Sequence, residues 1–99
     1  MKIKNGANIQ GISYKMRKVL VHANKVWEDY GQELVITCGM DGEHSAGSLH
    51  YYGLAVDLRT NYFDNSALEQ IKHELVLALG DDYDVFLHKT HMHVEYDPK

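Results

Sequence analysis

The sequence has little cysteine, no long apolar run and no basic cluster, and each shortage excludes a class of protein. The single cysteine, Cys38, cannot form an internal disulfide, so the chain is compatible with a reducing cytoplasm. An isolated cysteine next to a predicted strand is typical of a small buried apolar residue. A disulfide-stapled secreted module is therefore excluded.

No run of 18 apolar residues exists, so we expect no membrane partner. The residues after Met1 (Lys-Ile-Lys-Asn-Gly) lack the apolar centre of a secretory signal, which predicts synthesis in the cytoplasm. The formal net charge is −4 and basic residues do not cluster, so we expect no nucleic acid partner.

The length of 99 residues predicts one domain, residues 1–99, and leaves the oligomeric state open. A chain of this size buries only about 60–70% of its unfolded surface. A bound metal ion would therefore add useful stability.

Apolar residues at helical spacing predict two amphipathic helices. The first begins after Ser13 as N-cap and ends at Gly31. The second begins with a capping box at Ser66 and ends at Gly80. Residues 1–12 are polar and contain Gly6 and Gly11, so we expect an extended N-terminal segment.

Strands are predicted at 34–37, 54–59, 83–88 and from His91 onward. Helices and strands do not alternate regularly along the chain. This order predicts an α+β fold, with two helices packed on one face of a small, mainly antiparallel sheet. The functional cleft is expected on the other face.

The stretch from Ser48 to Arg59 contains the first candidate site residues. Alternation from Leu54 places Asp57 and Arg59 on the face opposite the apolar side chains. Gly53 allows a bend with positive φ, which would fold His50 back over Asp57.

A second stretch, His91-Met92-His93-Val94-Glu95, places His91, His93 and Glu95 on one strand face. If the preceding connection is a two-residue hairpin, His88 lies opposite His91 and Phe86 lies opposite His93. A shift of register by one residue would move His88 to the other face.

Two imidazoles and one carboxylate, from His50, Asp57 and His93, suit a zinc ion. Three protein ligands leave a fourth position for water, which is the arrangement of catalytic zinc sites. The sequence therefore predicts a zinc hydrolase.

The pattern S-x-H-x-x-G-x-A-x-D followed by H-x-H resembles a known family. It is similar to the zinc D-alanyl-D-alanine carboxypeptidases and L-alanyl-D-glutamate endopeptidases of peptidoglycan, the LAS metallopeptidases, whose superfamily includes the hedgehog signalling domain. The resemblance runs from about residue 36 to residue 98. The matched positions of the first pattern are Ser48, His50, Gly53, Ala55 and Asp57.

The resemblance implies that His50, Asp57 and His93 bind zinc and that His91 is an extra histidine beside the metal. The short chain and the Asp-Gly-x-His segment at 41–44 resemble small phage-encoded members. A phage lysin or virion component would act at the bacterial cell wall.

Two positions differ from the family. Relatives often carry an acidic base three to six residues before the last zinc histidine, where this chain has His88 five residues before, with Asp84 the nearest upstream carboxylate. His88 is the first candidate base and Asp84 the second. The arginine that binds the substrate carboxylate is also missing, so the candidate substrate contacts are His44, Ser48 and Arg59.

The expected activity is hydrolysis of peptide bonds in peptidoglycan stem peptides by a metal-activated water. The alternative is a non-catalytic, zinc-containing binding module, because the hedgehog domain shows that such a site need not belong to a peptidase. The sequence leaves open which bond is cut.

Overall fold

The computed structural model describes residues 1–39 and 52–98. In this part of the chain two helices and five strands follow one another, with both helices lying between strands in the sequence. Their bounds are β1 Lys2–Ile3, α1 Lys15–Asp29, β2 Val35–Cys38, β3 Ala55–Arg59, α2 Asn65–Leu79, β4 Tyr83–Leu87 and β5 His91–Tyr96.

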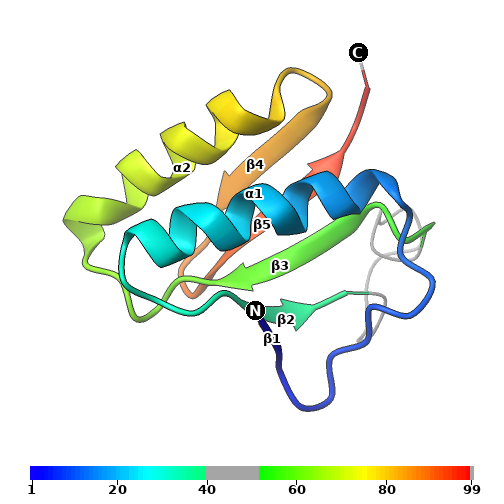
Figure 1. Ribbon diagram of the computed structural model, residues 1–99, viewed down its shortest axis with the longest axis horizontal. Coiled ribbons are helices and arrows are strands. Elements are labelled where there is room, and N and C mark those ends of the chain that lie inside the picture. The colour runs from blue at the N-terminus through cyan, green and yellow to red at the C-terminus, as the bar shows by residue number, and fades with distance from the viewer. Residues whose placement is uncertain (40–51, 99) are drawn as a thin grey trace.

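The strands form one sheet in the order β1-β2-β3-β5-β4. The β1–β2 pair is parallel, and the other three pairs are antiparallel. Figure 1 shows α1 and α2 side by side on one face of this sheet. The expected α+β fold, with two helices on one face of a mainly antiparallel sheet, is confirmed.

The core lies between the helices and the sheet. Alternate residues of the two central strands, β3 and β5, enter it and leave their neighbours on the opposite face. The fully buried residues of these two strands on the helix side are Val56, Leu58, Met92 and Val94, and the helices add Met16, Val19, Ala23, Trp27, Ile71 and Leu75. The opposite face of β3 and β5 therefore carries the polar side chains Asp57, His91, His93 and Glu95.

The end of α1 agrees with the sequence, whereas the start of α2 does not. Gly31 has φ +80°, its N–H donates to the carbonyl of Glu28, and the N–H of Gln32 donates to that of Trp27, which is a Schellman ending. The capping box predicted at Ser66 is wrong, because α2 begins at Asn65 and Ser66 lies inside its first turn.

The N-terminal segment adds a short edge strand that the sequence did not predict. The N–H of Lys2 donates to Leu34 O at 2.7 Å, and the N–H of Lys4 donates to Ile36 O at 2.9 Å. Two residues are too few to show a period of alternation. The strand forms because the edge of β2 offers backbone carbonyls that its N–H groups can bind.

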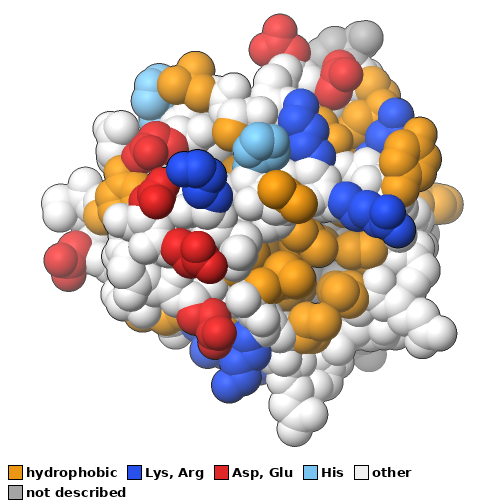
Figure 2. Space-filling model, in the orientation of Figure 1, with side chains coloured by type: hydrophobic (Ala, Val, Ile, Leu, Met, Phe, Trp, Pro, Cys, Tyr) orange, Lys and Arg blue, Asp and Glu red, His pale blue; other side chains and the backbone are white. Residues whose placement is uncertain are grey.

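The helix-covered face carries acidic, basic and hydrophobic side chains (Figure 2). Figure 2 shows acidic and basic side chains interspersed there, with hydrophobic side chains gathered near the centre. Neither of the two described helices has the length and apolarity that crossing a membrane requires.

Candidate metal centre

The two central strands bring Asp57 and His93 together. These residues are paired directly across β3 and β5, although 36 positions separate them in the sequence. The Nδ1 atom of His93 lies 3.0 Å from Oδ1 of Asp57, and the two side chains are only 17% and 14% exposed. Two of the three predicted zinc ligands are therefore in contact.

Glu95 contacts the other side of the His93 ring. Its Oε1 lies 2.8 Å from Nε2 of His93, so the imidazole is held between two carboxylates. The hydrogen bond with Asp57 is the largest cause of a raised pKa for His93, and Glu95 adds to it, while burial acts in the opposite direction. The folded, metal-free protein therefore binds the proton of this imidazole more tightly than an ordinary histidine does.

His91 and His88 lie beside this pair. Nε2 of His91 is 3.8 Å from Oδ2 of Asp57. The N–H of His88 donates to the carbonyl of His91 at 2.9 Å, and the two rings lie 4.9 Å apart between centroids. Phe86 is opposite His93. Of the two registers that the sequence left open, the structure has the two-residue hairpin, and the three histidines share one face of the sheet.

Asp84, the second candidate base, is not part of the histidine group beside Asp57. It is opposite Glu95 in the β4–β5 pair, two residue pairs beyond the Phe86–His93 pair on the side away from His88. Its carboxylate lies with those of Glu95 and Asp97 in a group whose oxygens are all within 4.8 Å of one another. No local motif indicates this acidic group, although the hairpin register that places Asp84 opposite Glu95 brings two of its members together.

The donor atoms fit a zinc ion. A tetrahedral zinc with bonds of about 2.0–2.2 Å holds its ligand atoms roughly 3.3 Å apart. The 3.0 Å between His93 Nδ1 and Asp57 Oδ1 is close to that separation. A carboxylate on the second nitrogen of a ligating histidine is also the usual arrangement around protein-bound zinc, and Glu95 supplies it. The third predicted ligand, His50, lies outside the described residues, as do His44 and Ser48.

The end of β3 is fixed by the buried Trp27 of α1. Its Nε1–H donates to the carbonyl of Arg59 at 3.0 Å, and its ring packs edge-on against Phe63 at 5.6 Å. Arg59 is thereby held opposite His91. Helical spacing places Trp27 on the apolar face of the first helix, but it does not indicate which carbonyl the indole reaches.

Gly53 precedes β3 and has φ +70°, as the sequence predicts. A Cβ here would lie 2.8 Å from Gly11 O and 2.9 Å from Ile12 Cα. The N–H of Ser13 also donates to the carbonyl of Gly53 at 2.8 Å. The absence of a side chain at Gly53 therefore permits both the positive φ of the bend and the close approach of the N-terminal segment.

No family model matches the chain, and comparison with curated proteins gives no match either. A functional conclusion therefore depends on the side chains described above and on the resemblance of the two motifs.

Proposed function

We propose that the protein is a zinc-dependent hydrolase of peptide bonds in peptidoglycan stem peptides, acting at the bacterial cell wall as a phage lysin or virion component. The observation that carries the proposal is the connected set Asp57–His93–Glu95 on the sheet face opposite the helices. The resemblance of the motifs around Asp57 and His93 supports the substrate class.

The metal ligands in this proposal are Asp57 and His93, with His50 as the third. Glu95 fixes the orientation of the His93 ring and increases its basicity. A zinc ion at this position would lower the pKa of water toward about 7 and polarise the scissile carbonyl. Two imidazoles and one carboxylate are a ligand set of catalytic zinc sites.

In this proposal His91 binds the carbonyl oxygen of the substrate, and His88 transfers the proton. His91 is one-third exposed and within 3.8 Å of Asp57, so it is placed to donate a hydrogen bond to the carbonyl oxygen of the substrate. His88 is exposed, and its ring stacks beside that of His91. It is the better candidate to take the proton of the attacking water and pass it to the leaving amine, since Asp84 lies beside Glu95 instead.

The test is digestion of purified peptidoglycan by the zinc-loaded protein, followed by mass spectrometry of the released muropeptides. We expect cleavage of one class of peptide bond, identified by the fragment masses. His91→Ala and His88→Ala should each lower the rate by about 10²–10⁴-fold while keeping zinc. His73→Ala, an exposed residue of α2, is the matched control and should retain full activity.

One result favours the alternative function. If the protein binds one zinc per chain but cuts no peptide bond in peptidoglycan or in soluble muropeptides, hydrolysis is wrong. A non-catalytic zinc-containing binding module then replaces it.

A further inference from the structure

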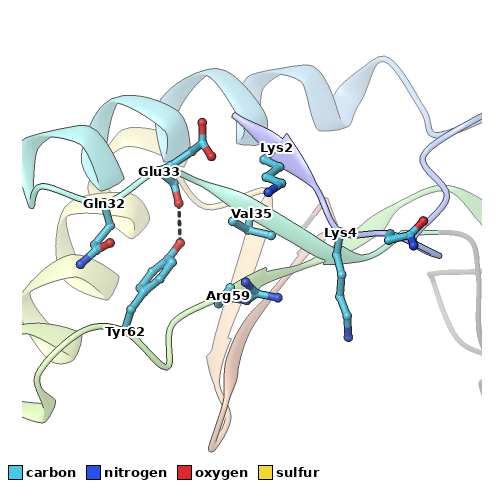
Figure 3. A pocket seen from close by; sticks show the side chains of 8 residues that line it. Lys2, Lys4, Gln32, Glu33, Val35, Arg59 and Tyr62 are labelled. Carbon is cyan, nitrogen blue, oxygen red and sulfur yellow. Dashed lines mark hydrogen bonds between the residues drawn. The ribbon is translucent and has the colours of Figure 1, made fainter.

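A basic pocket of about 390 Å³ includes Arg59, the residue paired with His91 across β3 and β5. Lys2 and Lys4 from the N-terminal edge, Val35 from β2 and Arg59 from the end of β3 line it (Figure 3). Tyr62 closes one side, where its hydroxyl donates to the carbonyl of Glu33 at 2.6 Å.

The register of the sheet connects this pocket to the candidate centre. Lys2 pairs with Val35, and the antiparallel pairing of β2 with β3 places Val35 opposite Arg59. Arg59 in turn pairs with His91. Because neighbouring strands lie about 4.8 Å apart, these residues form one continuous row that leads from the pocket to the histidines.

The pocket is positively charged within an acidic protein. Three cationic side chains line it against one carboxylate, Glu33, which lies 4.0 Å from the amine of Met1. No ion pair connects Lys2, Lys4 or Arg59 to a carboxylate in residues 1–39 and 52–98. With a formal net charge of −4 for the whole chain, this concentration of cations favours an anionic ligand.

We propose that this pocket binds a side-chain or terminal carboxylate of an acidic peptide whose backbone extends to the candidate metal centre. The inference rests on the proposed function and specifies its substrate as a peptide with a carboxylate near the reacting bond. Asp57 and Arg59 share one face of β3 and are about 6.6 Å apart along the strand. An extended peptide advances about 3.3 Å per residue, so the carboxylate lies about two residues from that bond.

The arginine and the lysines have different roles. The guanidinium of Arg59 can bind a carboxylate through two parallel hydrogen bonds. Lys2 and Lys4 act as mobile point charges that add attraction without fixing orientation. Removing one charge should therefore weaken binding, and the effect should be larger for Arg59.

The experiment is an NMR titration of the ¹⁵N-labelled full chain, with and without zinc. The probes are N-acetyl-L-alanyl-D-glutamate and its neutral diamide. The dicarboxylate should shift the amide signals of Lys2, Lys4, Val35 and Arg59, and the diamide should not. Arg59→Gln should weaken binding about tenfold or more, since a hydrogen bond to a charged group is lost. Lys25→Gln on α1, whose amine lies 3.6 Å from Asp29, is the matched control and should bind normally.

Different results contradict the binding pocket and the hydrolase activity. If the wild-type protein cleaves stem peptides, Lys4→Gln should raise KM and leave kcat unchanged. Equal KM for Lys4→Gln and wild type, or equal binding of the dicarboxylate and the diamide, overturns the pocket assignment. Inorganic phosphate that binds these residues as tightly as the dicarboxylate overturns it also. Binding of the dicarboxylate by a protein that cleaves nothing supports the pocket and contradicts the hydrolase.

Discussion

The imidazole of His93 touches a carboxylate through each of its nitrogens, and this arrangement has different consequences with and without a metal ion. Without metal, Asp57 and Glu95 stabilise the protonated ring. With metal, Nδ1 must be unprotonated to act as a ligand, and the N–H of the other nitrogen donates to Glu95. One side chain therefore links proton binding to metal binding.

In the metal-free protein, the contribution of His93 to stability should fall as the pH rises. The pKa of His93 is raised above its ordinary value of 6.5 in the folded state, so the folded chain holds this proton more tightly than the unfolded chain. The stabilisation is complete below pH 6.5 and is lost as the pH rises through the raised pKa. Urea unfolding in chelator at a series of pH values measures it.

The matched variants for this pH series are His93→Gln and His73→Gln. The first should lack the slope that His93 contributes, and the second, at an exposed position on α2, should keep it. An NMR titration of His93 with a midpoint below its ordinary value of 6.5 in the metal-free protein would contradict the proposed hydrogen bonding.

Glu95→Gln should lower zinc affinity by about 10–100-fold, which is the usual effect of removing a carboxylate that orients a zinc histidine. Competition with a zinc-binding dye measures the affinity. The comparison variant is Glu69→Gln, at an exposed position of α2, and it should bind zinc like the wild type. An unchanged affinity in Glu95→Gln would mean that the contact with His93 has no role in metal binding.

At the scale of elements, the close approach of the N-terminal segment to the start of β3 should be sensitive to one methyl group. Gly53→Ala meets the backbone of Gly11 and Ile12 and adopts an unfavourable φ. The conformation costs about 1–2 kcal/mol and the overpacking about 1–3 kcal/mol. Urea denaturation measures the loss of stability.

Gly80→Ala separates these two effects. Gly80 has φ +85°, and a Cβ at this residue would have no other atom within 4 Å, so its substitution carries the conformational cost alone. Gly53→Ala should therefore be the more destabilising of the two. Equal losses would show that the N-terminal segment does not lie against Gly53.

The elements that the sequence predicted well are those with one buried face. Alternation in β3 and β5 places Asp57 and His93 correctly, because a shift of register by one residue would expose their apolar neighbours. The short hairpin then places His88 and Phe86. The start of α2 was missed because Asp64 and Ser66 are both acceptable N-cap residues.

At the scale of the whole molecule, the position of the N-terminal strand in the sheet could not be predicted. The row from Lys2 through Arg59 to His91 depends on strand order, and no local pattern indicates that Lys2–Ile3 pairs with β2. The basic pocket beside the histidines is therefore a property of the assembled sheet. In contrast, the contact of Asp57 with His93 follows from two motifs that each resemble a family pattern.

If the proposed site binds zinc, the ion should stabilise the entire fold, because the proposed ligands come from separate segments. Free zinc at about 100 times its Kd adds about 2.7 kcal/mol to the free energy of unfolding. For a domain of this size each kcal/mol raises Tm by about 4–8 °C, so the expected increase is roughly 10–20 °C. Calorimetry with zinc and with chelator measures it, and His93→Ala should show no such increase.

The most direct test of the proposed metal centre is the X-ray absorption spectrum of the protein loaded with one equivalent of zinc. The predicted result is a four-coordinate ion with nitrogen and oxygen neighbours at about 2.0–2.2 Å, including two imidazoles, one of which is lost in His93→Ala. Failure to retain zinc, or a sulfur neighbour at about 2.3 Å from Cys38, would contradict a site built from His50, Asp57 and His93.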